Sequence, residues 1–187
     1  MARLSLALAL LVLFASAPAA ADHGPRPLRT GPTFGVGVGA GNMFSNCDDD
    51  FDCGNVLESA SVHAYAGGFL GSDTALIIEG WGMVHRDDRV TITHGMAAGA
   101  LQQWLVPRLW FKGGVGIARS SFTYDAIVAD IEDRRDIVPG ALAALGLDVV
   151  QGTYAAFDLQ LRYGAALSGD SEARIHQLAL NAGLSWH

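Results

Sequence analysis

The most informative segment of the sequence for the fold is Phe157-Asp158-Leu159-Gln160-Leu161-Arg162-Tyr163. Apolar and polar residues alternate strictly along it. In an extended chain successive side chains point to opposite faces, so all the apolar side chains share one face and all the polar ones share the other. A helix would spread the same charges around its whole circumference. The stretch therefore predicts a β-strand with one apolar and one polar face.

The same alternation returns at residues 178–186, and weaker versions fill most of the chain between Pro32 and the C-terminus. Together they predict eight strands, over residues 33–43, 56–70, 75–86, 89–104, 109–121, 140–150, 155–168 and 174–186. The expected connections are tight at 71–74, 105–108 and 151–154 but long at 44–55 and 123–139. Short turns at one end and longer loops at the other are typical of an all-β, antiparallel up-and-down barrel that crosses the bacterial outer membrane, with the turns facing the periplasm.

The N-terminal residues read as an export signal. Arg3 precedes an apolar run over residues 4–14, and Pro18-Ala19-Ala20-Ala21 ends in the small residues that signal peptidase accepts. We expect a cleaved signal peptide over 1–21, an extended periplasmic lead-in over 22–32 and one barrel domain over 33–187. The apolar run is too short to span a bilayer as a helix.

The composition excludes several classes of protein. Half of the residues are hydrophobic, 17% are charged, and 23 are Gly, which is too apolar for a disordered chain and too rich in glycine for a helical bundle. The net charge of −7 argues against nucleic-acid binding. Because no nucleotide-binding, zinc-protease or nucleophile-elbow motif is present, we expect no cofactor.

Lipid requires an apolar exterior, so the charged face of each strand is predicted to point into the barrel. This places a polar network in the lumen, made of Glu79, Lys112, Asp148, Asp158 and Arg162, beside Gln103, Gln160 and Gln177. By the same parity, Arg119 and His94 are expected outside, near the outer end. Side chains just fill an eight-stranded barrel, so we interpret the network as packing, with a pore or a catalytic pair of carboxylates as the weaker readings. The alternating glycines of residues 34–40 fit such a crowded interior.

Large aromatic residues follow a second pattern. When the predicted strands are traced up and down, six of them fall at the same end, where their rings would suit a membrane interface. They are Phe34, Phe69, Trp104, Trp110, Phe157 and Trp186.

Taken together, the chain resembles the small eight-stranded outer-membrane barrels, the family of OmpX and the transmembrane domain of OmpA. The most specific part of the resemblance is the final strand, where Asn181-Ala182-Gly183-Leu184-Ser185-Trp186 looks like the family's assembly signal. His187 departs from it, because the family usually ends on an aromatic residue. The resemblance implies a location in the outer membrane of a Gram-negative bacterium, contact with outer-membrane lipid and lipopolysaccharide, and insertion by the barrel-assembly machinery.

The two long loops, 44–55 and 123–139, are expected to face outward. The first holds Cys47 and Cys53, which in an exported chain predict a loop disulfide rather than a metal site. Both loops are rich in acidic residues, which leaves weak binding of divalent cations open beside the simpler interpretation of a solvated loop. The apolar residues of the second loop, among them Ile131, Ile137 and Val138, predict either longer strands or a contact surface for a partner.

Three functions remain in competition at this point. The first is a non-enzymatic surface barrel with a role in envelope integrity or adhesion, as the resemblance implies. The second is a lipid A-modifying barrel enzyme, for which His85, Asp87, Ser120 and Ser121 lie at suitable heights without forming a motif. The third is a soluble periplasmic carrier of the lipocalin kind, whose apolar face would point inward.

Overall fold

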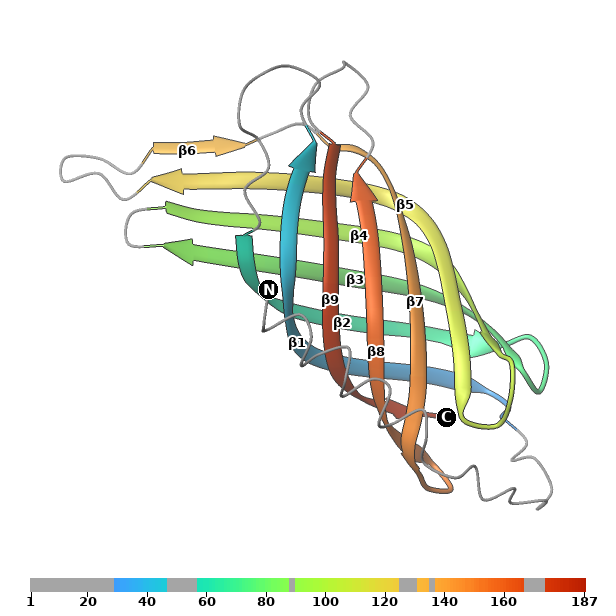
Figure 1. Cartoon of the computed structure of the whole chain (residues 1–187). Helices are drawn as coiled ribbons and strands as arrows, with labels where there is room; N and C mark the ends of the chain where they lie inside the picture. The colour runs from blue at the N-terminus through green and yellow to red at the C-terminus, as the bar shows by residue number, and fades with distance from the viewer. Residues whose placement is uncertain (1–28, 47–56, 88–89, 125–130, 135–136, 167–173) are drawn as a thin grey trace.

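The computed structural model describes residues 29–46, 57–87, 90–124, 131–134, 137–166 and 174–187. These residues form antiparallel β-strands joined by turns (Figure 1). The strands are β1 Pro32–Asn46, β2 Leu57–Phe69, β3 Thr74–Asp87, β4 Val90–Trp104, β5 Leu109–Tyr124, β6 Ile131–Arg134, β7 Val138–Gln151, β8 Ala155–Ala166 and β9 Arg174–Trp186. In this part of the chain, no helix is long and apolar enough to cross a membrane.

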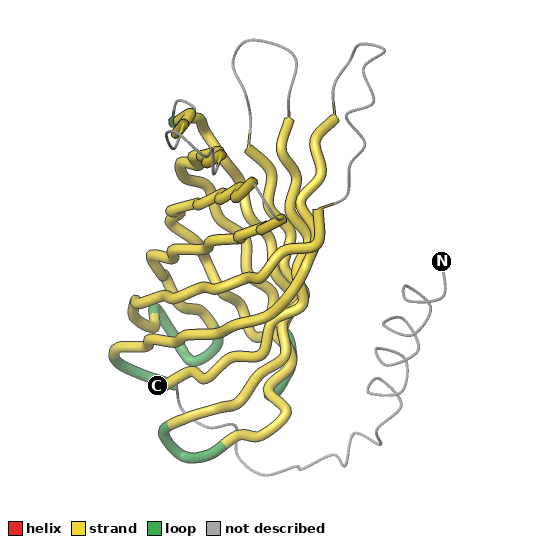
Figure 2. The backbone as a smooth tube through the Cα atoms, turned by 90° about the vertical axis from the view of Figure 1, so that its left-hand side faces the viewer, coloured by secondary structure: helices red, strands yellow, loops and turns green. Residues whose placement is uncertain are grey.

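Eight of the strands close into a barrel, as Figure 2 shows from the side. Each strand of the wall pairs with the next one, and β5 pairs with β7 because the short β6 lies beside the tip of β5 and does not pair with β7. The wall is closed where β1 pairs with β9, from Phe34 opposite Trp186 to Asn46 opposite Arg174. Closure gives the wall no free edge, so the backbone groups that face lipid are paired. The predicted fold class, an eight-stranded antiparallel up-and-down barrel, is confirmed.

All eight predicted strands are present, and a ninth lies inside the predicted loop 123–139. The short strand β6 pairs with the tip of β5, from Ser121 opposite Arg134 to Tyr124 opposite Ile131. Some apolar residues of this loop therefore extend the strands, as one of the two interpretations expected. The predicted signal peptide, most of the lead-in, and both Cys47 and Cys53 lie outside the described residues.

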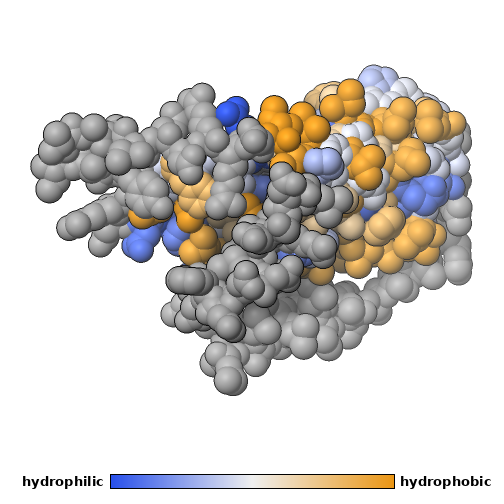
Figure 3. All heavy atoms as spheres, turned by 90° about the horizontal axis from the view of Figure 1, so that it is seen from above, coloured by the Kyte–Doolittle hydropathy of each residue, from blue (hydrophilic) through white to orange (hydrophobic). Residues whose placement is uncertain are grey.

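The exterior of the barrel is apolar. Ile78 of β3 and Val115 of β5 are 75% and 73% exposed, and apolar residues gather over the visible wall in Figure 3. Leu161 and Leu180 also point outward, whereas their neighbour Arg162 is buried inside. This arrangement is the reverse of a soluble carrier, so the lipocalin-like alternative is wrong.

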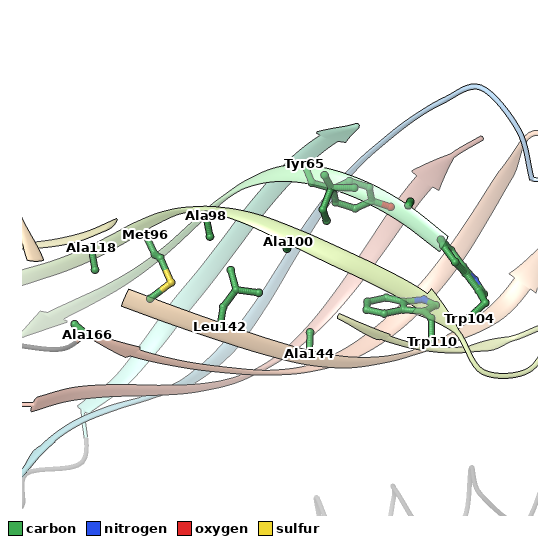
Figure 4. Close-up of a cluster of buried hydrophobic side chains, with 12 residues drawn as sticks. Tyr65, Met96, Ala98, Ala100, Trp104, Trp110, Ala118, Leu142, Ala144 and Ala166 are labelled. Atoms are coloured by element: carbon green, nitrogen blue, oxygen red, sulfur yellow. The ribbon is translucent and has the colours of Figure 1, made fainter. Parts of the chain in front are cut away.

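Side chains fill the interior. Aromatic, aliphatic and small residues from β2, β3, β4, β5, β7 and β8 form one continuous cluster, which includes Tyr65, Met96, Trp110 and Leu142 (Figure 4). The glycines of β1 make room for it, because a Cβ atom at Gly37 would overlap the ring of His63. The crowded interior that the alternating glycines indicate is therefore present.

Candidate functional site: two charge clusters in the lumen

The first cluster joins strands from opposite sides of the barrel. Lys112 of β5 donates a hydrogen bond from Nζ to Oε2 of Glu79 on β3 over 2.9 Å. Arg162 of β8 donates from Nη2 to Oε1 of the same carboxylate. All three residues are at most 1% exposed. Because β3, β5 and β8 are not neighbours in the wall, this ion triplet ties the barrel together across its lumen.

Further contacts extend the triplet. The Arg162 Nη1 donates to Oε1 of Gln160 over 2.8 Å, and Gln160 Nε2 donates to Oδ1 of Asp158 over 2.6 Å. The ammonium group of Lys112 lies 4.4 Å from the ring centre of Tyr65, and the guanidinium of Arg162 lies 4.9 Å from that of Trp81. Such contacts offset the cost of taking charges out of water.

Uncharged polar residues form a neighbouring network. The indole nitrogen of Trp81 donates to Oγ of Ser61 over 2.9 Å, and the amide of Asn181 contacts both Ser61 and His63. Asn181 belongs to β9 and the other three residues to β2 and β3, so these hydrogen bonds hold the closing strand to the first half of the wall.

The second cluster lies at the end with the short turns. Its centre is Asp148 of β7, whose Oδ1 accepts from Nε1 of Trp110 over 3.0 Å and whose Oδ2 accepts from Nε1 of Trp104 over 3.4 Å. Arg29, which precedes β1, lies 3.5 Å from Oδ2 of the same carboxylate. Burial lowers the pKa of Arg29, while the charges of Asp148 and Asp73 act in the opposite direction.

The two clusters balance in charge. Among the described residues, three buried acids face three buried bases: Glu79, Asp148 and Asp158, and Arg29, Lys112 and Arg162. Buried charges are tolerated when they are paired and hydrogen-bonded. Five of the six have a partner of opposite charge within 4 Å, and Asp158 accepts a hydrogen bond from Gln160. The ion pairs of Glu79 link strands across the lumen.

The structure brings the predicted lumen residues together in two groups. Glu79, Lys112 and Arg162 are in direct contact and reach Asp158 through Gln160, whereas Asp148 stands apart in the second cluster. Gln160 and Gln177 also point inward. Gln103 does not: it lies in the outward register and hydrogen-bonds Thr74, and its neighbour Gln102 is the buried one.

Two of the predicted interface aromatics are inside the barrel. Trp104 and Trp110 are 8% and 2% exposed and bind Asp148, so their placement at the lipid interface is wrong. Phe34 and Phe157 do face outward. Trp186 stacks on Phe34 at 5.1 Å between ring centres. Phe69 is half-buried and packs against the interior cluster, with its ring centre 5.5 Å from that of Trp104, so its placement on the lipid-facing side is also wrong.

His94 is a further correction. It was expected on the exterior, but it is 1% exposed and its Nδ1 lies 2.8 Å from Oγ of Ser120, which is also buried. His85, by contrast, contacts the backbone oxygen of Glu58. His85, which was considered for a lipid A-modifying site, therefore contacts Glu58 and not Ser120. The pair that forms, His94 and Ser120, is buried inside the barrel. In the described part of the chain no group of three or more His, Cys, Asp or Glu residues could hold a metal ion.

Solved structures with the same architecture are outer-membrane barrels. The chain is similar to Ail, the attachment invasion locus protein of Yersinia pestis, with a TM-score of 0.61 and 9% identity over 83% of this chain and 99% of that one. It is similar to Neisserial surface protein A, with a TM-score of 0.54 and 13% identity over 82% and 96%. It is also similar to the N-terminal β-barrel domain of Pseudomonas aeruginosa OprF, with a TM-score of 0.51 and 12% identity over 84% and 98%.

The fold is thus that of the small eight-stranded outer-membrane barrels, as the resemblance in the sequence implied. No protein-family model matches the chain, and no curated protein matches its sequence.

Proposed function

We propose that this protein is a non-enzymatic outer-membrane barrel that acts through its outward-facing hairpins, by contact with a partner at the cell surface. Adhesion is the role that we favour, with envelope integrity as the alternative. Ail, which shares the fold, is described as an attachment invasion protein. The proposal includes export through a cleaved signal peptide to the outer membrane of a Gram-negative bacterium.

The observation that carries the proposal is the filled lumen. The Glu79 triplet and the Asp148 cluster lie across the lumen, and buried apolar side chains pack inside the same barrel. A barrel of this size without an open bore has only its exterior and its loops for interaction. This argues against transport and favours the outer surface.

The outer end offers a rigid base for such a contact. The hairpin of β3 and β4 is paired as far as Asp87 and Val90, and β5 continues into the hairpin with β6 (Figure 1). Paired strands form the base from which the expected outer loops 44–55 and 123–139 leave the barrel.

Cells that carry the protein provide the test. We would compare the wild type with a variant in which residues 125–130 are replaced by a Gly-Ser turn, and score binding to host cells and to matrix-coated surfaces. Adhesion predicts that binding falls while the variant still folds and reaches the outer membrane. Equal binding by cells with and without the protein would contradict it.

Three further readouts separate the alternatives. Greater sensitivity to detergent in cells that lack the protein, with no change in binding, would favour envelope integrity. An altered acyl pattern of lipid A would favour an enzyme. Stepwise conductance in a planar bilayer would favour a pore.

Lipid and assembly partners belong to the same proposal. The apolar wall would contact outer-membrane lipid and lipopolysaccharide. The final strand, with Asn181 and Gly183 pointing inward and Leu184 outward, would be the segment that the barrel-assembly machinery recognises.

A further inference from the structure

Arg29 is buried although it does not belong to a strand. It lies three residues before β1 and is 2% exposed. It is held at the mouth of the barrel that carries the short turns, where the β2–β3 and β4–β5 turns meet β7. A long basic side chain in a segment before the first strand would ordinarily remain in water, so its burial calls for a specific partner.

The partners of Arg29 come from three parts of the wall. Its Nη2 donates to the backbone oxygen of Pro107, in the β4–β5 turn, over 2.7 Å, and it lies 3.5 Å from Oδ2 of Asp148 on β7. Its guanidinium carbon is 4.5 Å from the ring centre of Trp104, at the end of β4. A carboxylate, a carbonyl and an aromatic face are the groups that a planar guanidinium recognises best.

The carboxylate of this site needs a counter-charge. Asp148 lies directly opposite Asp158 on β8, and both side chains are buried. Like charges in such a cross-strand pair repel each other. Asp158 is linked through Gln160 to the Glu79 triplet. Arg29 is the cation that contacts Asp148, and the indoles of Trp104 and Trp110 orient the carboxylate toward it.

We propose that the short-turn mouth of the barrel is a guanidinium-binding site, and that its ligand is the chain's own Arg29, so that residues 29–31, directly before β1, are latched at the mouth. The latch joins the start of the barrel to β4, the β4–β5 turn and β7 on the far side of the lumen. It can form only after those strands are in place.

Trypsin offers a direct test on the unmodified protein in nanodiscs. Trypsin cleaves after Lys and Arg, and the next two such residues after Arg3 are Arg26 and Arg29. Arg26 precedes Pro27 and resists trypsin, whereas Arg29 precedes Thr30. The latch predicts that the bond after Arg29 stays intact in the folded protein and is cut in urea. In Asp148→Asn, cleavage there should be at least about tenfold faster, because a charge-assisted contact no longer holds the latch closed. Glu58→Gln, an exposed acid at the other end of the barrel, is the control.

A binding experiment tests the site itself. In Arg29→Ala, the indole N–H signals of Trp104 and Trp110 should shift in the NMR spectrum, and millimolar methylguanidinium should move them back toward the wild-type positions. Methylammonium, which has the charge without the planar fork, should restore them less well. Arg108→Gln removes a charge from the exposed part of the β4–β5 turn and should leave both signals unchanged.

Two results would overturn the proposal. One is cleavage after Arg29 in the folded wild type at the rate seen in urea. The other is an Arg29→Ala spectrum in which neither indole signal differs from the wild type. If Arg29→Ala does not fold, the trypsin comparison of the wild type with Asp148→Asn still decides.

Discussion

The lumen and the lipid-facing wall of this barrel are built from the same strands but follow opposite rules. Inside, Glu79, Lys112 and Arg162 are almost fully buried and joined to one another. Outside, one residue away along β3, Ile78 is 75% exposed. Each strand therefore separates two environments. The free-energy cost of a charge is higher on the exterior, where neither water nor a partner is available.

The largest expected effect comes from breaking the ion triplet. Glu79→Gln leaves Lys112 and Arg162 as two buried cations that have lost their shared counter-ion. We expect the free energy of unfolding to fall by about 3–5 kcal/mol. Urea unfolding in lipid vesicles, followed by tryptophan fluorescence, measures it. Glu58→Gln on the exposed end of β2 is the matched control, and an equal small loss in both variants would show that the triplet contributes little.

The lipid-facing side of β3 is tested at Ile78, next to Glu79. Ile78→Arg places a charge on the lipid face close to the level of Glu79. The expected loss is about 2–4 kcal/mol, the cost of an arginine near the bilayer midplane. The same unfolding assay applies, with Ile78→Leu as control. A variant as stable as the wild type would mean that this face does not lie in hydrocarbon.

A smaller effect is expected at the periplasmic mouth. Trp110→Phe keeps an aromatic, though smaller, side chain and removes the 3.0 Å hydrogen bond to Asp148. Because the acceptor is a carboxylate, the expected loss is about 1.5–3 kcal/mol. Trp186→Phe, on the exterior, should cost less. If the order were reversed, the indole bond to Asp148 would not be a determinant of stability.

The smallest effect belongs to the stacked pair on the outer wall. Phe34 and Trp186 stack with their planes inclined by 16°, where β1 meets β9. A double-mutant cycle of Phe34→Leu and Trp186→Leu should give a coupling of about 0.5–1.5 kcal/mol. Additive losses would indicate that lipid, and not the partner ring, stabilises each residue.

The periodicity of the sequence predicted the wall well. The alternation at 157–163 correctly assigned the inward and outward faces of β8, because charges marked one parity without ambiguity. In β4 the adjacent Gln102 and Gln103 leave it uncertain which alternate residues point inward. An inward Gln103 implies an outward Trp104 and an outward His94, and the structure has both of these side chains inside.

The inward direction of Trp110 could have been predicted from its spacing to Lys112. It lies two residues before Lys112 and must share its inward face in an extended strand. The alignment of aromatic residues at one end favoured the interface instead. Arg29 could not have been predicted, since no periodicity reaches a residue outside the strands; its role depends on the three-dimensional meeting of the β4–β5 turn with β7.

Lipid-borne paramagnetic relaxation tests, on the unaltered chain, whether the apolar side chains of the wall point into hydrocarbon. In nanodiscs containing a spin label near the end of the acyl chain, the methyl signals of Val36, Val115, Leu161 and Leu180 should broaden strongly. Those of Ile77 and Leu142, which point inward, should remain sharp. Sharp signals from the first group together with broadened signals from the second would contradict the account.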